Sequence, residues 1–186
     1  PAIHVVIRSE GCEDNAPGVC GKAYIQVNGA EYSQKHNVVV VQGATVLFWF
    51  GIYLPFFNLI QFRSGQVLSN RAFDTHGSQS EGVRLRDYLN AIRGNYIVLV
   101  AIGDEGSLHV SPAINALKRL GASDPDVTVK LRESYALIGY AGDNKPSWIE
   151  QKSARKANGP SIISSRILLK LCKLRHFTPQ TLLDIR

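Results

Sequence analysis

The run Tyr96–Ile102, Y-I-V-L-V-A-I, constrains the fold of this chain more than any other segment. Its residues are apolar or aromatic and most are β-branched, which predicts a strand in the core of a sheet. The run His36–Gln42 has four valines in succession, a pattern typical of a strand that is buried on both faces. These two runs predict that the domain is built on a β-sheet core.

Shorter segments predict further strands around this core. Their alternating or β-branched residues lie in His4–Arg8, Lys22–Val27, Glu31–Ser33, Val67–Asp74 and Tyr135–Tyr140. The dipeptide Asn28-Gly29 follows the second of these segments and is a strong signal for a hairpin turn. We therefore expect a hairpin between the second and third segments.

Two segments have the spacing of helices. Apolar residues at positions 85, 88, 89 and 92 lie on one helical face, which predicts a helix over Val83–Ile92. The pair Ser111-Pro112 is a preferred helix start and predicts a second helix over Ala113–Leu120. Thr75–Gly82 and Asp124–Asp126 are expected to be loops. Because strands and helices are interspersed, we assign the chain to the α+β class, with a β-sheet core and flanking helices.

The charge distribution argues against a nucleic-acid partner. The net charge of the 186 residues is +6, but residues 1–149 contain 13 basic and 13 acidic residues. The excess lies in residues 150–186, which contain 8 basic and 2 acidic residues. A domain that binds phosphate backbones is expected to have its basic residues on the folded body. The length fits one domain, which we expect over residues 1–160.

The sequence contains no pattern of catalytic or metal-binding residues. It has no nucleophile elbow, phosphate loop or set of metal ligands. Cys12 and Cys20 flank a turn-rich stretch and either form a disulfide that closes a small loop or remain free thiols, and Cys172 would be left unpaired. We therefore expect a protein without enzymatic activity, metal or cofactor.

Two segments do not fit the rest of the chain. Residues 43–62 form an uncharged apolar insertion, and residues 161–186 form a tail rich in leucine and basic side chains. The insertion is long and apolar enough to be a candidate membrane span. A span is disfavoured because it would place two strands that we expect to pair on opposite sides of a bilayer, whereas a re-entrant membrane loop avoids this objection. The alternatives are translated non-coding sequence or a recent insertion.

Four blocks of residues resemble a known family by their order and spacing. They are R-A-F-D-T-H-G (71–77), N-Y-I-V-L-V-A-I-G-D-E-G-S-L-H-V with A-L-K-R-L-G-A-S (95–123), L-R-E-S-Y-A-L-I-G-Y-A-G (131–142) and K-P-S-W-I (145–149). This order is similar to that of the ILEI/PANDER domain, which occurs in interleukin-like secreted factors, in the stem of a glycosyltransferase and in a hyaluronan-binding protein. The resemblance implies an ILEI/PANDER-like single domain that is secreted, extracellular or lumenal. The insertion and the tail have no counterpart in the family.

Sugar binding needs planar and polar groups that pair with hydroxyls, and two segments supply such groups. The turn after Tyr96–Ile102 contains Asp104, Glu105, Ser107 and His109, and the second segment contains Arg132 and Tyr135. If the segments are neighbours at one end of a sheet, they form a charged pocket with an aromatic edge. The resemblance to the transferase stem, which binds a terminal sugar, implies this role for Asp104 and Arg132 in particular. Alternatively, Arg132 forms a structural ion pair with Asp104 or Asp74.

These residues and the resemblance lead to two hypotheses about function. The first is a non-catalytic domain that binds a glycan or a glycosylated protein at the Asp104/Arg132 end. The second is a cytokine-like secreted ligand of a cell-surface receptor, which requires an exposed apolar patch instead. Glycan binding is the principal hypothesis.

Overall fold

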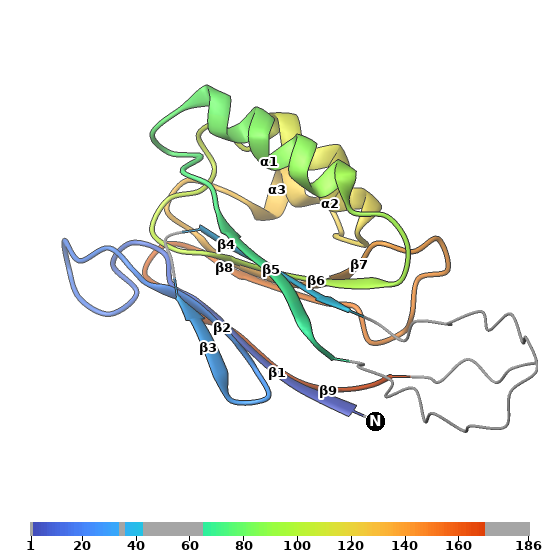
Figure 1. The fold of residues 1–186 in the computed structure, drawn as a ribbon. Helices are drawn as coiled ribbons and strands as arrows, with labels where there is room; N and C mark the ends of the chain where they lie inside the picture. The colour runs from blue at the N-terminus through green and yellow to red at the C-terminus, as the bar shows by residue number, and fades with distance from the viewer. Residues whose placement is uncertain (1, 34–35, 43–64, 170–186) are drawn as a thin grey trace, which may run out of the picture.

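The domain consists of three layers (Figure 1). A computed structural model describes residues 2–33, 36–42 and 65–169. A four-stranded and a five-stranded antiparallel sheet pack face to face, and helices cover the outer face of the five-stranded sheet. The described part of the chain is therefore β-rich with flanking helices, in agreement with the predicted sheet core.

The four-stranded sheet has the order β3-β2-β1-β9. Its strands are β1 (Ala2–Ser9), β2 (Ala23–Val27), β3 (Ala30–Ser33) and β9 (Ser161–Leu168). Buried and more exposed residues alternate along β1 and β2, because one face of the sheet packs on the core. The predicted hairpin joins β2 to β3, and Asn28 and Gly29 both have a positive φ, as the preferred two-residue turn requires.

The five-stranded sheet has the order β5-β4-β6-β7-β8. Its strands are β4 (His36–Gln42), β5 (Val67–Ala72), β6 (Tyr96–Ile102), β7 (Ser134–Tyr140) and β8 (Glu150–Ala154). The central strand is β6, as predicted. In β4, Val39 and Val41 face the four-stranded sheet, whereas Val38 and Val40 face the helices, and all four valines are buried. The prediction of a strand buried on both faces is therefore confirmed.

The helices agree with the predicted positions but differ at their boundaries. Helix α1 (Gln79–Ala91) begins four residues before Val83, and the Ser78 hydroxyl caps it by accepting a hydrogen bond from the Ser80 N–H. A 3-10 turn (Ser111–Ala113) precedes helix α2 (Ile114–Arg119). The residue at the cap position of this turn is Val110, so Ser111 is not the cap that we predicted. A short helix, α3 (Pro125–Thr128), replaces a predicted loop.

The folded domain extends beyond the expected boundary at residue 160. Strand β9 pairs with β1 over its full length, from Ala2 opposite Leu168 to Ser9 opposite Ser161. Ile163 and Ile167 of β9 are fully buried between the two sheets. The first part of the predicted basic and apolar tail is therefore a core strand.

Two of the expected features lie outside the described residues. The apolar insertion over residues 43–62 is one of them, and the remainder of the tail, with Cys172, is the other. Within the described ranges, none of the helices has the length and apolar character that crossing a bilayer would require.

Candidate functional site

The predicted site residues lie where β6 ends and β7 begins. Ile102 and Tyr135 are partners in the β6–β7 pair, so the turn after β6 and the loop before β7 are neighbours at the same end of the sheet. A third loop, which contains Cys12 and Cys20, follows β1 and reaches this end as well. The structure thus places the turn that contains Asp104 and Glu105 beside the backbone of Arg132.

Glu105 joins two of these loops. Its side chain is buried, and one carboxylate oxygen accepts hydrogen bonds from the N–H and hydroxyl of Ser107 at 2.6 and 2.7 Å. The other oxygen accepts a hydrogen bond from the backbone N–H of Arg132 at 2.6 Å. Because both Glu105 oxygens accept hydrogen bonds from the protein itself, the buried Glu105 side chain holds the two loops together. We predicted that Glu105 contacts a ligand directly, whereas in the structure its carboxylate binds backbone and side-chain groups of the two loops.

His109 contributes to the site through its backbone. Its N–H donates a hydrogen bond to the Thr75 carbonyl at 3.0 Å, and the Thr75 hydroxyl donates to the Gly106 carbonyl at 2.9 Å. These two bonds attach the turn after β6 to the segment that leads into α1. Like Glu105, His109 fixes the position of the loop.

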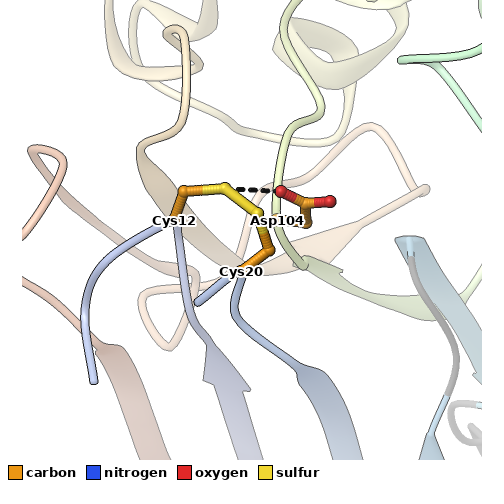
Figure 2. Close-up of side chains that lie close together, drawn as sticks. All are labelled: Cys12, Cys20 and Asp104. Atoms are coloured by element: carbon orange, nitrogen blue, oxygen red, sulfur yellow. Dashed lines mark hydrogen bonds between the residues drawn. A yellow bond between two sulfur atoms is a disulfide. The ribbon is translucent and has the colours of Figure 1, made fainter. Parts of the chain in front are cut away.

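Asp104 lies between the turn and the cysteine loop. It adopts a positive φ of 68°, its N–H donates a hydrogen bond to the Glu10 carbonyl at 2.9 Å, and it forms an isolated bridge with Gly11. One carboxylate oxygen lies 2.6 Å from the Cys12 sulfur (Figure 2). Asp104 as a whole is partly exposed at this end of the domain.

Cys12 and Cys20 form the disulfide that was one of the two predicted alternatives (Figure 2). The bridge closes the loop that follows β1. The two sulfurs and one Asp104 oxygen lie within 4.8 Å of one another. Metals bind thiolates, and sulfurs that are bonded to each other do not supply them. The cluster is therefore a cross-link beside a carboxylate.

Arg132 is the most exposed of the predicted site residues. Its backbone has a positive φ of 60°, and its amide is held by Glu105, while the side chain is exposed to solvent. Among the described residues, Arg132 forms no ion pair, so the alternative role as a partner of Asp104 or Asp74 is not observed. The Arg132 backbone is thus fixed, while its guanidinium lacks an ion-pair partner within the described ranges.

The predicted aromatic edge is absent from this surface. Tyr135 is completely buried, and its hydroxyl donates a hydrogen bond to the Gln151 side chain at 3.1 Å. Burial raises the pKa of Tyr135 far above its ordinary value. The prediction that Tyr135 lines the site is therefore wrong, because its position in β7 turns the ring into the core beneath the helices.

Glu10 is a structural residue of this end that the sequence did not indicate. Its buried carboxylate accepts hydrogen bonds from Arg8 Nε at 2.6 Å, Asn15 Nδ2 at 2.7 Å and the Lys22 N–H at 3.0 Å. Burial alone would raise the pKa of this carboxyl, but the hydrogen bonds from Lys22, Arg8 and Asn15 outweigh it and lower the pKa. Glu10 therefore ties the cysteine loop to the start of β2.

Buried serines join the two sheets behind the loops. The Ser9 hydroxyl donates a hydrogen bond to the Ile102 carbonyl at the end of β6 and accepts one from the Tyr135 N–H at 2.7 Å. The hydroxyls of Ser134 and Ser161 are also hydrogen-bonded, at 2.8 Å. These contacts satisfy buried polar groups and fix the strand ends from which the site loops project.

Replacing Glu10 by glutamine is expected to lower the free energy of unfolding by about 1–3 kcal/mol at neutral pH, because the amide nitrogen replaces one of the two acceptor oxygens and faces at least one of the three donors. The pKa of Glu10 is lowered by folding, so its stabilising effect is complete at neutral pH and is lost as the pH falls through the folded pKa. Urea unfolding at pH 7 and at about pH 3.5 measures how much the free energy of unfolding falls on acidification. This fall should be smaller in Glu10→Gln than in the unsubstituted protein. Glu31→Gln, at an exposed position, is the control, and equal acid losses in both variants would contradict the assignment.

The fold and its cross-linked loops define a disulfide-bonded, β-rich domain with polar groups gathered at the end of its central strand. A family model described as interleukin-like EMT inducer (ILEI) matches residues 36–143, which is more than half of the chain. The chain therefore belongs to the ILEI family.

Two curated relatives share a shorter region. Over 66 residues the chain is 39% identical to the cell migration-inducing and hyaluronan-binding protein of Homo sapiens, covering 35% of this chain and 5% of that protein. The protein of the same name from Mus musculus is 38% identical over 66 residues, with the same coverage. The matched region thus corresponds to a small part of much longer proteins.

Proposed function

We propose that this ILEI domain is a non-catalytic extracellular module that binds a carbohydrate or a glycosylated protein through Arg132 and Asp104. The observation that carries the proposal is the exposed Arg132 side chain, which lacks an ion-pair partner among the described residues and whose backbone is held beside the Asp104 turn by Glu105 and Gly11. A guanidinium offers a planar fork of donors, and a carboxylate accepts from hydroxyls. Together they match the hydroxyls of a sugar.

The geometry of the loops supports a preformed site. A Cβ built on Gly11 would overlap the Arg132 carbonyl, so the two loops touch at a position where only glycine fits. Arg132 and Asp104 both have a positive φ, and hydrogen bonds to Glu105 and Glu10 hold them in that conformation. Fixed loops reduce the entropy that binding would otherwise cost.

The relatives and the disulfide support the class of partner and the compartment. The two curated relatives are named as hyaluronan-binding, and hyaluronan is a carbohydrate. A disulfide between Cys12 and Cys20 fits an oxidising compartment such as the extracellular space. The non-catalytic part of the proposal rests on the sequence, which lacks the motifs of the common catalytic sites.

Replacing Arg132 by lysine is expected to weaken glycan binding by about 5- to 150-fold, because lysine keeps the charge but loses the fork of donors. Binding of the purified domain to a glycan array identifies the ligand, and titration calorimetry with that ligand measures the loss. The melting temperature should change little, since the Arg132 side chain is exposed. Arg166→Lys, at an exposed position of β9, is the matched control.

Two results would contradict this proposal. One is an array on which no glycan binds the unsubstituted domain. The other is an Arg132→Lys variant that binds as tightly as the unsubstituted domain but melts at a lower temperature, since this would assign the side chain a purely structural role.

A second candidate function is that of a cytokine-like ligand for a protein receptor. Two large apolar side chains on the site loops favour it, because Leu108 is 56% exposed and Leu131 is 65% exposed. Contiguous exposed apolar side chains mark protein interaction sites, and arginine is enriched at protein interfaces. Replacement of both leucines by serine would weaken binding to a cell-surface receptor, whereas glycan binding through Arg132 would be retained.

A further inference from the structure

A polar hollow opens at the opposite end of the β6–β7 pair from the candidate site. It lies where α1 ends, β6 begins and β7 ends, and its volume is about 490 Å³. This volume is in the range of small-molecule sites. The residues that line it are mostly polar: Arg93, Gly94, Asn95, Arg119, Tyr140, Ala141, Gly142, Asp143 and Asn144.

Arg119 forms the inner wall of this hollow. It is the last residue of α2, and its guanidinium donates hydrogen bonds to the carbonyls of Leu89 at 2.5 Å, Ile92 at 3.2 Å and Ala141 at 3.4 Å. The first two carbonyls belong to the end of α1, which has no basic residue in its own last turn. Arg119 thus supplies the positive charge that favours a helix C-terminus.

A second cation is held in the same manner. Lys145 donates hydrogen bonds from Nζ to the carbonyls of Tyr140 at 2.8 Å and Gly142 at 2.7 Å. Burial and the nearby charge of Arg119 lower the pKa of Lys145. Arg119 and Lys145 are therefore fixed in place by neutral carbonyl groups.

The residues that line the hollow have an excess of positive charge. Arg93 lines the hollow beside Arg119, and Asp143 is the single carboxylate among the lining residues. None of the ion pairs formed by described residues includes Arg93, Arg119, Lys145 or Asp143. Burial lowers the pKa of Arg119, and repulsion from Arg93 lowers it further, while Asp143 opposes this effect. Arg93, Arg119 and Lys145 thus have Asp143 as the single carboxylate among the lining residues, and Asp143 acts on both Arg119 and Lys145.

We propose that this hollow binds an oxyanion, namely the carboxylate, sulfate or phosphate group of a small ligand. An oxyanion between Arg93 and Arg119 would relieve the repulsion between the two guanidinium groups. Neutral groups add to the site: Asn95 accepts a hydrogen bond from the Tyr140 hydroxyl at 2.7 Å, which orients its amide, and Asn144 lies on the rim. Arg119 is already placed by the helix end, so little order remains to be created on binding.

This site is independent of the proposed glycan site, because it lies at the other end of the sheet and shares none of its residues. The test uses three probes: sodium sulfate, sodium phosphate and sodium acetate, each titrated at constant ionic strength against sodium chloride. The backbone amide signals of Gly94, Asn95 and Gly142 in ¹H–¹⁵N spectra report on binding. Local spectra are preferable to melting temperatures, because sulfate and phosphate stabilise folded proteins without occupying a site.

At least one probe should shift these amide signals in a saturable manner. The midpoint is the probe concentration that gives half of the full shift. Arg93→Gln, which removes one guanidinium without disturbing the Arg119 hydrogen bonds, should raise this midpoint about tenfold. Asp143→Asn should lower the midpoint about fivefold, because it removes a repelling charge. Arg84→Gln, an exposed arginine of α1, should leave the midpoint unchanged. The probe that binds most tightly identifies the source of the oxyanion.

Three results would overturn the proposal. The first is a shift of the amide signals that rises linearly with concentration, without saturation, for all three probes. The second is an Arg93→Gln midpoint equal to that of the unsubstituted protein. The third is an Asp143→Asn midpoint that is unchanged or raised, since the proposal rests on the excess of positive charge in the hollow.

Discussion

Replacing Gly82 by alanine is expected to destabilise the domain by about 2–3 kcal/mol. Gly82 is a buried residue of α1, and a Cβ built on it overlaps the backbone carbonyl of His109 and contacts Pro112. Neither group can move freely, because the His109 segment is attached to Thr75 by a hydrogen bond and Pro112 starts the 3-10 turn before α2. Helix α1 would have to move away from the turn after β6.

Whether Gly82→Ala lowers or raises the free energy of unfolding is more informative than the size of the change. Alanine in place of glycine within a helix normally stabilises a protein by about 1 kcal/mol. Equilibrium urea unfolding of Gly82→Ala and of Asp87→Ala, at an exposed position of the same helix, would separate the two effects. Asp87→Ala should be neutral or slightly stabilising. A Gly82→Ala variant that is more stable than the unsubstituted protein would show that α1 is not packed against the turn in this way.

Removal of the disulfide is expected to cost about 2–3 kcal/mol of stability. Cys12 and Cys20 are separated by 8 positions, and closing a loop of this length removes that much conformational entropy from the unfolded chain. The loop also carries Gly11, which contacts the Arg132 carbonyl, and Asp14, which accepts hydrogen bonds from the N–H groups of Gly11 and Gly159. The double variant Cys12→Ser/Cys20→Ser should therefore also bind a glycan ligand more weakly.

Dithiothreitol provides the control for this prediction. The reductant should lower the stability of the unsubstituted protein to about that of the double variant, and it should leave the double variant unchanged. Urea unfolding with and without the reductant measures both effects. A double variant that is as stable as the oxidised protein would show that the bridge does not constrain the unfolded chain.

The core strands could be predicted from the sequence because their signals are local. The valine run of β4 and the apolar run of β6 indicate burial on both faces without reference to any other segment. The turn at Asn28-Gly29 similarly depends on only two residues. Such signals are independent of the partner strands, which explains why the central sheet and the early hairpin were predicted with nearly correct bounds.

Strands β8 and β9 were not predicted because their environment depends on residues that are far away in the sequence. Strand β8, E-Q-K-S-A, lies at the edge of its sheet and is largely polar. In β9, Ile163 and Ile167 are buried, but two serines and an arginine lie between them, and leucines follow. This composition resembled the tail beyond it more than a strand. Only the pairing with β1 reveals its place in the sheet.

The adjacency of the two loops was predicted better than the roles of the residues in them. The prediction that Asp104 and Arg132 lie at one end of the sheet followed from their positions next to β6 and β7. The buried role of Glu105 depends on backbone amides of another loop. Glu10 falls out of phase with the inward residues of β1, so the periodicity of the strand does not predict its burial. Side-chain roles of this kind depend on contacts between loops, which periodicity does not describe.

The position of β1 between β2 and β9 has a consequence for the synthesis of the protein. One edge of β1 pairs with β2 early, but its other edge pairs with β9, the last strand in the described part of the chain. At a synthesis rate of about 5–20 residues per second, that edge stays unpaired for on the order of ten seconds or more after β1 is made. An open strand edge with the sequence I-H-V-V-I invites pairing with other chains. The nascent domain therefore depends on its final strand for protection from aggregation, and a chain shortened to residue 160 would lack that protection permanently.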